Sequence, residues 1–261
     1  MSLGDRWDAI VRFGRGLGVA GAIAFFWSAA FVLAWVVVPY VVLRERTRDG
    51  QRRRLQRLIA AAWRWFLRTL ERLTLYRARY RGEAPYQGPA VVVANHPSLL
   101  DVTGIIACMP HTCCVVKSSL IRSPLVGRLL RALGHIEAGD GSLAGGLAVL
   151  EDMSARLSEG YAVLVFPEGT RSPQGGMHPF RRGAFAAAKR AGVPVVPLLL
   201  RCDPPALGKG SPVWRHPRRC PTLTVDVGAP IDTAHVDPAE VCDNVQADFR
   251  ARLSASTPGE T

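Results

Sequence analysis

The stretch from residue 16 to residue 43 contains no charged side chain, and this limits what the chain can fold into. The stretch is longer than the roughly 20 apolar residues that a helix needs to cross a bilayer. The apolar region of a secretory signal peptide is shorter, about 7 to 15 residues. We therefore predict a retained membrane anchor in residues 1–50. It would be one tilted helix or a broken pair of helices in a single leaflet, with five candidate break points: Gly14, Gly16, Gly18, Gly21 and Pro39.

Positive charge is concentrated directly after this apolar stretch. The 261 residues carry a formal net charge of +12, and residues 44–81 contain thirteen Arg against three acidic residues. Such a segment favours an anionic partner, which could be membrane phosphate, a phosphorylated substrate or nucleic acid. Because no nucleic-acid recognition motif is present, we expect membrane lipids as partners and no nucleic acid. The positive-inside rule then places the anchor in the cell inner membrane and the following domain on the cytoplasmic side.

Residues 51–75 have the pattern of a basic amphipathic helix. Apolar residues recur at steps of three and four, and the opposite face carries Arg53, Arg57, Arg64, Arg68 and Arg72. In one interpretation the helix lies at the membrane surface, with Trp63 and Trp65 near the headgroups and Arg on lipid phosphates. In the other, the apolar stripe packs on the domain and the Arg face is solvated. The position directly after an apolar span favours the membrane interpretation.

Strands and helices alternate between residues 76 and 253. Short apolar runs rich in β-branched residues predict buried strands, and segments with helical periodicity separate them. This alternation predicts an α/β domain with a central, partly parallel sheet flanked by helices. The predicted strands are 76–81, 90–94, 113–117, 135–136, 162–166, 193–200 and 223–227. The predicted helices are 99–109, 126–133, 142–158, 183–191 and 238–253, followed by a disordered tail at 254–261.

The six Cys do not form a disulfide framework. They include no Cys-x-x-Cys pair and are too few for a small disulfide-stabilised fold. We expect reduced thiols in a reducing compartment, with Cys113 and Cys114 in the core and not acting as nucleophiles. Ligand spacing typical of zinc is also absent, so no metal site is predicted.

His96 and Asp101 lie where the strand predicted at 90–94 runs into a helix. Pro97 suits a first helical turn and would place Asp101 in that turn, where negative charge is favoured. The Asp101 carboxylate would bind one ring nitrogen of His96 and leave the other free to accept a proton. A neutral His held in this way is a good general base for a hydroxyl nucleophile. Taken alone, the pair is more often an ordinary polar residue and a helix cap, because short motifs match by chance.

A second block, residues 166–172, also follows a predicted strand. Gly169 permits unusual backbone angles and close approach of an anion, and Arg171 offers a planar fork that matches phosphate oxygens. Thr170 adds a hydroxyl group, and Glu168 either contacts substrate or orients the turn. Since ligands bind where strands end in open α/β sheets, the two blocks are expected to meet at one edge of the sheet.

The two blocks together resemble the glycerolipid acyltransferase family, whose members acylate lysophosphatidate and glycerol 3-phosphate. That family carries an Asn-His-x4-Asp block and a Phe-Pro-Glu-Gly-Thr-Arg block, which residues 95–101 and 166–171 match. The resemblance runs from about residue 90 to residue 200. It implies an acyltransferase domain, which we place at residues 76–253.

The resemblance also implies the reaction. His96 would remove the proton from the hydroxyl of lysophosphatidate, which attacks an acyl thioester of coenzyme A or acyl carrier protein, while Asp101 holds the imidazole. The thioester is a co-substrate, and no cofactor is implied. Backbone amides after His96 are candidate donors to the oxyanion. The residues implied in substrate binding are Glu168, Gly169, Thr170, Arg171 and Lys117.

One region departs from the family pattern. The family often places an Arg after the residue that corresponds to Asp140, whereas Gly141 follows here. The basic residues near Lys117 that could take its place are Arg122, Arg128 and Arg131. Two alternatives therefore stay open: an acyltransferase for another lyso-lipid, such as a lyso-ornithine-type or specialised lipid, and a non-catalytic protein that binds anionic lipid.

Overall fold

A mixed sheet forms the centre of the α/β domain. The computed structural model describes residues 3–208, 210 and 216–255. Its strands are β1 (Arg77–Gly82), β2 (Val91–Ala94), β3 (Thr112–Val116), β4 (Ile136–Glu137), β5 (Ala162–Val165), β6 (Val195–Asp203) and β7 (Thr222–Val227). They form a 7-stranded sheet in the order β1-β7-β6-β2-β5-β3-β4. β6 and β7 run antiparallel and the other neighbours run parallel, which confirms the predicted fold class.

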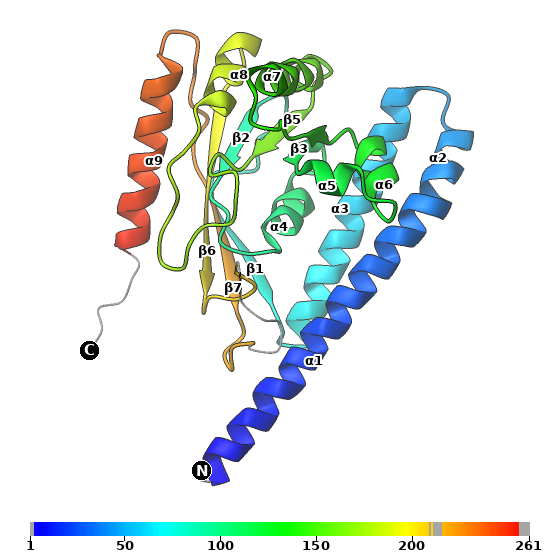
Figure 1. Cartoon of the computed structure of the whole chain (residues 1–261), viewed down its shortest axis with the longest axis vertical. Coiled ribbons are helices and arrows are strands. Elements are labelled where there is room, and N and C mark those ends of the chain that lie inside the picture. Colours follow the sequence, from blue (N-terminus) through cyan, green and yellow to red (C-terminus); the bar gives the residue numbers. More distant parts are fainter. Residues whose placement is uncertain (1–2, 209, 211–215, 256–261) are drawn as a thin grey trace.

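Helices cover both faces of the sheet. They are α3 (Arg48–Arg72), α4 (Asp101–Cys108), α5 (Ser118–Ile121), α6 (Gly127–Ala132), α7 (Leu143–Ser158), α8 (Gly183–Ala191) and α9 (Pro238–Ser254). All residues of β2 are buried, and they alternate between two hydrophobic cores. Val92 and Ala94 share a core with α3 and α4, whereas Val91 and Val93 share the other with α7, α8 and α9 (Figure 1). Because the apolar side chains of β2 point to both faces of the sheet, helices must pack on both faces to bury them.

The uncharged N-terminal stretch forms one long helical arm. It consists of α1 (Leu3–Val32), a π-helical turn η1 (Leu33–Val37) and α2 (Val38–Arg44). α1 runs through all four candidate glycines without interruption, so a break at these positions is excluded. The irregular turn ends two residues before Pro39, which lacks the N–H that continues the helical ladder. The span 13–44 is long and apolar enough to cross a membrane.

α3 folds back beside this arm and packs its apolar stripe on the domain (Figure 1). Trp63 stacks on Phe26 of α1, with ring centroids 4.8 Å apart, and Arg64 donates a hydrogen bond to the Ala107 carbonyl at 3.0 Å. Trp63 therefore packs on the N-terminal arm, whereas the burial of the stripe in one core with strand residues agrees with the interpretation in which the stripe packs on the domain. The buried residues of the stripe include Leu55, Ile59, Phe66 and Leu70. Lipid contact stays a prediction for three exposed arginines, Arg57, Arg68 and Arg72.

Other elements differ from the sequence-based prediction in detail. The sequence pattern does not indicate α5, because four residues are too few to show a period. β4 begins one residue after its predicted position, and β6 continues to Asp203. Of the predicted tail at 254–261, residues 256–261 lie outside the described residues. All six Cys are free thiols, as predicted, and burial raises the pKa of Cys113 to about 11.

Candidate active site

The two sequence blocks meet at one edge of the sheet. β2 and β5 are parallel neighbours, so the loops after their carboxyl ends lie side by side. His96 is in the loop after β2, and the second block is in the loop after β5. The carbonyl of His96 accepts a hydrogen bond from the N–H of Ser172 at 2.8 Å. The structure therefore brings together the two blocks that were expected to share a site.

Asp101 holds the imidazole of His96. The Nδ1 atom of His96 lies 2.8 Å from Oδ2 of Asp101, which stands in the first turn of α4. Oδ2 also accepts a hydrogen bond from the N–H of Ser98 at 2.7 Å, so two groups fix the carboxylate. The side chain of His96 is 19% exposed, whereas that of Asp101 is fully buried. Because Nδ1 faces the carboxylate, Nε2 is left to receive a proton.

Burial dominates the titration of Asp101. It raises the pKa of the carboxyl group to about 6. The hydrogen bonds from His96 and from the Ser98 amide act in the opposite direction, as does the positive charge of Arg171. The charged form of Asp101 therefore depends on partners supplied by both blocks, and this charged form is the one that stabilises a protonated imidazole.

Phe166 packs against the face of the imidazole. Its ring stacks on that of His96 with centroids 4.2 Å apart and an interplanar angle of 20°. The stack and the hydrogen bond to Asp101 together restrict the rotation of the imidazole ring. Nothing in the local sequence marks Phe166 for this role, because the contact arises only when β2 and β5 pair.

The carboxylate of Glu168 binds groups from both blocks. Oε1 accepts hydrogen bonds from the N–H of His96 at 3.1 Å and from the hydroxyl of Ser172 at 2.5 Å. Oε2 accepts a hydrogen bond from the N–H of His178 at 2.8 Å. Glu168 is also only 5% exposed. The geometry therefore supports a bracing role for Glu168 in place of the contact with substrate implied by the resemblance.

Arg171 joins the site to the loop after β6. Its Nη1 atom donates hydrogen bonds to the carbonyl groups of Leu207 at 3.0 Å and Gly208 at 3.1 Å. The Leu207 carbonyl also accepts a hydrogen bond from the N–H of Leu99 at 3.1 Å. The guanidinium is near enough to Asp101 to lower the pKa of that carboxyl group. Arg171 thus lies beside the pair, although one end of its fork is used within the protein.

The sequence profile of the Acyltransferase family matches residues 74–201 of this chain. The matched region contains both blocks and the His96–Asp101 pair. The chain belongs to the acyltransferase family. This membership confirms the resemblance inferred from the two blocks, and it makes the protein an enzyme that transfers acyl groups.

Individual relatives agree with the family match. The chain is 29% identical to 1-acyl-sn-glycerol-3-phosphate acyltransferase alpha of Mus musculus, over 83% of this chain and 75% of that protein. It is 31% identical to the protein of the same name from Homo sapiens, over 67% of this chain and 62% of that protein. The crystal structure of a 1-acyl-sn-glycerophosphate acyltransferase from Thermotoga maritima has the same fold. Its TM-score is 0.72 at 21% identity, over 95% of this chain and 99% of that chain.

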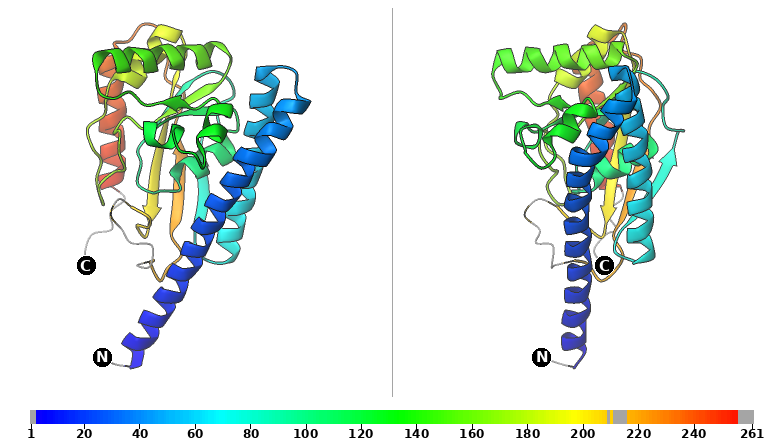
Figure 2. Two further views of the ribbon diagram at one scale, coloured as in Figure 1. Left: turned by 45° about the vertical axis from the view of Figure 1, so that its right-hand side comes forward. Right: turned by 90° about the vertical axis from the view of Figure 1, so that its right-hand side faces the viewer.

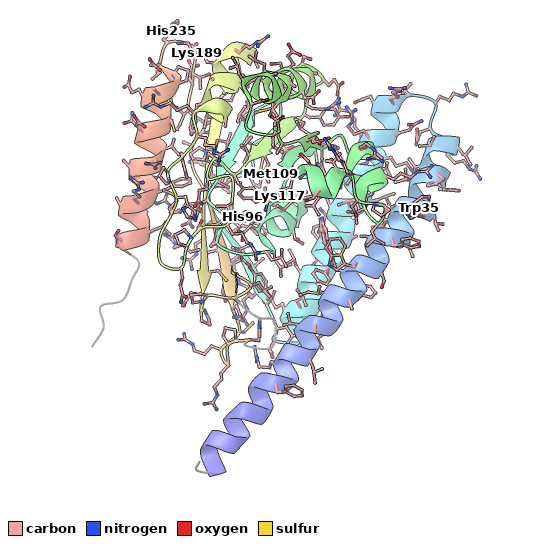
Figure 3. The ribbon with its side chains drawn as sticks, viewed as in Figure 1. Trp35, His96, Met109, Lys117, Lys189 and His235 are labelled. Atoms are coloured by element: carbon pink, nitrogen blue, oxygen red, sulfur yellow. The ribbon has the colours of Figure 1, made fainter. Side chains whose placement is uncertain are left out.

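The other implied binding residues of this acyltransferase lie at the same edge of the sheet. Gly169 adopts a positive φ of +69°, which favours glycine, and a Cβ there would meet the Arg181 guanidinium at 3.3 Å. Thr170 is half-buried in the same turn. Lys117 is exposed and follows β3, which is parallel to β5, so it leaves the sheet at the edge that carries His96 (Figure 3).

The side chain of Asp140 stabilises the loop that leads into α7. Oδ1 of Asp140 accepts hydrogen bonds from the N–H of Ser142 at 2.9 Å and from its hydroxyl at 2.6 Å. Arg122 forms an ion pair with Glu137 at 2.7 Å. The residues that stand in for the missing Arg of the family pattern are therefore partly used in local contacts of this acyltransferase.

The amides directly after His96 already have partners within the protein, so neither Ser98 nor Leu99 presents a free N–H to an oxyanion. Pro97 has no N–H. The N–H of Ser98 donates to Asp101, and the N–H of Leu99 donates to the Leu207 carbonyl. In this acyltransferase the Ser98 amide holds the Asp101 carboxylate, and the Leu99 amide ties the loop after β2 to the loop after β6.

Two further buried polar residues, Asn95 and Tyr76, support the site through their side chains. The side-chain amide of Asn95 donates to the Leu200 carbonyl at 2.9 Å and accepts from the Leu200 N–H at 2.7 Å, which ties the end of β2 to β6. The hydroxyl of Tyr76 donates to the Ser98 hydroxyl at 3.2 Å. An Asn at the end of an apolar strand is a usable signal for such a bond, because buried amides require partners. Nothing in the sequence marks Tyr76.

Proposed function

We propose that this protein is a membrane-associated 1-acyl-sn-glycerol-3-phosphate acyltransferase. It transfers a fatty acyl group from acyl-coenzyme A or acyl carrier protein to the free hydroxyl of lysophosphatidate, which gives phosphatidate. The observation that carries the proposal is the 2.8 Å contact between Nδ1 of His96 and Oδ2 of Asp101. The family match and the names of the mammalian relatives support it.

His96 acts as the general base. Its Nε2 atom takes the proton of the acceptor hydroxyl as the hydroxyl oxygen attacks the carbonyl carbon of the thioester, and Asp101 stabilises the imidazolium that forms. A C–O bond forms, the C–S bond breaks, and the proton passes from Nε2 to the leaving sulfur. The acyl group never bonds to the protein, so no activated Ser or Cys is required. Burial raises the pKa of Cys108 to about 12, which agrees with the absence of such a role for this thiol.

The acceptor phosphate binds beside this base. Arg171 and Lys117 supply positive charge at the edge of the sheet that carries His96, and Gly169 and Thr170 belong to the loop after β5 at the same edge. Guanidinium and ammonium groups are the usual protein partners of phosphate oxygens. The Nη1 contacts of Arg171 with the loop after β6 hold this side chain in position.

The catalytic domain works at the cytoplasmic face of the inner membrane. The long apolar arm of residues 13–44 anchors it, and the Arg-rich start of α3 follows on the cytoplasmic side. This placement lets an acceptor that resides in the bilayer reach the site without leaving the lipid phase. A soluble thioester would approach from the cytoplasm.

Acyl transfer by the purified full-length chain tests the proposal. The assay follows phosphatidate formed from lysophosphatidate and acyl-coenzyme A or acyl carrier protein, in detergent. His96→Ala should lower kcat about 10²- to 10⁴-fold, because it removes the general base. His235→Ala is the matched control, since His235 is exposed near the start of α9 and far from His96 (Figure 3). Turnover near the wild-type rate in His96→Ala would show that the mechanism is wrong.

A second acceptor is favoured by one observation. Gly141 replaces the Arg of the family pattern, and the Asp140 carboxylate is bound to Ser142. This loop would therefore suit a lyso-lipid with a different headgroup, such as a lyso-ornithine-type lipid. Competition between the two acceptors in one assay decides between them. Vesicle binding that survives His96→Ala, without thioester consumption by the wild type, would instead indicate a non-catalytic lipid-binding protein.

A further inference from the structure

The segment that contains α5 and α6 exposes apolar side chains to solvent. Leu120 is 38% exposed and Leu125 is 48% exposed, and Pro124 between them is exposed as well. Exposed cationic side chains alternate with these residues along the chain, and we call the whole group the α5–α6 patch: Lys117, Leu120, Arg122, Pro124, Leu125 and Arg128. Apolar residues ringed by Lys and Arg are typical of a surface that contacts anionic lipid.

The turn between α5 and α6 is rigid, so the exposure of its leucines is built into the fold. Nη1 of Arg131 donates to the Ile121 carbonyl at 2.5 Å, and the N–H of Gly127 donates to the Ser123 carbonyl at 2.8 Å. A Cβ at Gly127 would lie only 2.2 Å from the Ile121 carbonyl oxygen, so the two backbones are in close contact. A turn braced in this way does not fold its leucines inward.

The patch is continuous with the membrane arm. The indole N–H of Trp35, in η1, donates a hydrogen bond to the Pro124 carbonyl at 3.3 Å. The guanidinium of Arg128 lies over the Trp35 ring, 5.6 Å from its centroid. Trp35 is itself 47% exposed, so the apolar surface of the arm runs into the α5–α6 patch. In the right-hand view of Figure 2, α5 and α6 lie on one side of the arm and α3 lies on the other, although α6 also contacts α3.

The patch also lies on the catalytic side of the domain. Lys117 follows β3, whose carboxyl end is at the same edge of the sheet as that of β2, where His96 begins the catalytic loop. Leu99, three residues after His96, is 49% exposed at this edge. A lipid surface that contacts the patch therefore also lies close to the entrance of the site.

We propose that the α5–α6 patch is a second membrane contact, which inserts Leu120 and Leu125 at the boundary of headgroups and acyl chains and places Arg122 and Arg128 on lipid phosphates. This goes beyond the proposed function, because it concerns how the catalytic domain is held against the bilayer and does not depend on the acceptor. An acidic carrier protein could also be attracted by the charges. The continuity with the apolar arm favours lipid.

Depth measurement on the full-length chain tests this directly. Leu125→Cys is labelled with a nitroxide and reconstituted in phosphatidylcholine vesicles with and without phosphatidylglycerol. The unsubstituted chain, labelled in parallel, gives the background from native thiols. The label should gain access to oxygen and lose access to a water-soluble nickel complex. Ala247→Cys, on the exposed face of α9, is the control and should stay in water.

A kinetic experiment tests the same membrane contact by replacing the exposed leucines with negatively charged residues. The double variant Leu120→Glu, Leu125→Glu should lower the rate on lysophosphatidate in vesicles about 10-fold or more and leave the rate in detergent micelles unchanged. Ala247→Glu carries the same kind of charge change and should alter neither rate. Equal rates in vesicles for the double variant and the wild type would overturn the proposal. A label at position 125 that stays in water when the protein is bound to vesicles would also overturn the proposal. This conclusion holds even if added acyl carrier protein then shields the label, because the patch would then bind the carrier and not lipid.

The two arms separate this proposal from the proposed function. The depth measurement requires no catalysis, so an inserted label in a chain without acyl transfer would support the membrane contact and contradict the proposed reaction. Acyl transfer by a chain whose label remains in water would support the proposed reaction and contradict the membrane contact.

Discussion

The carboxylate of Glu168 accepts a hydrogen bond from the backbone N–H of His96, although the two residues are 72 positions apart in the chain. The same carboxylate binds Ser172 and His178, so it joins the loop of the catalytic base to the loop after β5. The backbone position of the base is thus set by a residue of the second block. This relationship gives the Pro-Glu-Gly-Thr-Arg block a structural function in addition to any contact with the acceptor.

Substitution of Glu168 by Gln should impair turnover more than acceptor binding. The amide keeps only one acceptor oxygen, so either the N–H of His178 or the hydroxyl of Ser172 loses its acceptor, while the N–H of His96 keeps the Ser172 hydroxyl at 3.0 Å. We expect a loss of about 1–3 kcal/mol in the free energy of unfolding. Displacement of the base should lower kcat by up to about 10²-fold. Denaturant unfolding and steady-state kinetics measure both effects.

The comparison variant for this prediction is Ser172→Ala, which removes one donor to Glu168 and one of the two acceptors of the His96 N–H. Because the Glu168 carboxylate still accepts from His96 and His178, this variant should give a smaller change in both quantities. A Glu168→Gln variant with unchanged kcat and a raised KM for lysophosphatidate would instead show that the side chain contacts substrate.

Substitution of Asp101 by Asn should remove most activity and preserve the fold. The amide nitrogen of Asn would donate to Nδ1 of His96 and so favour the tautomer that carries its proton on Nε2, which cannot act as the base. We expect kcat to fall about 10²- to 10⁴-fold, the range of losses associated with a general base or its orienting carboxylate. Kinetics with near-ultraviolet circular dichroism measures this, and a variant within a factor of a few of wild type would contradict it.

Activity and stability should respond to pH in opposite directions around the titration of Asp101. Burial raises the pKa of this carboxyl group from 3.8 to about 6. In that window the unfolded chain has lost the proton and the folded chain keeps it, so stability falls as pH rises from about 4 to about 6. Activity should rise over the same window, because only the carboxylate stabilises the imidazolium.

Thermal unfolding and kcat/KM, both followed against pH, check this prediction. The Asp101→Asn variant provides the reference, since it lacks the titrating group and should lose this component of the stability profile. A wild-type profile that matches that of Asp101→Asn between these pH values would contradict the assignment.

Removal of the aromatic ring of Phe166 should let the imidazole of His96 rotate more freely and so lower the rate. Phe166→Ala deletes a stack whose centroids are 4.2 Å apart, and such aromatic pairs contribute about 0.5–1.5 kcal/mol beyond the area they bury. We expect kcat to fall about 10-fold, since the imidazole gains rotational freedom. Phe166→Tyr keeps the ring and should restore most of the rate. If Phe166→Leu and Phe166→Tyr behave alike, bulk and not stacking is what the site requires.

Several features of the fold and site follow from local sequence. The β-branched runs predict β2, β3 and β5, and Gly192 in the left-handed conformation ends α8 at the predicted residue. The contact of His96 with Asp101 spans five positions across a strand–helix junction. Such a contact needs only the turn that Pro97 favours, so the spacing of the residues contains it.

Other features were decided by the tertiary structure alone. The bracing role of Glu168, the stack of Phe166 on His96 and the carbonyl partners of Arg171 all require β5 to pair with β2, or the loop after β6 to reach the second block. The apolar stripe of α3 is as suited to a bilayer as to a protein core, and only the packed domain shows which of its residues are buried. Local sequence determines the periodicity of an element and its close neighbours, because these depend on backbone geometry. The order of strands in the sheet depends on the whole chain, and it selects the partners of each polar group in the site.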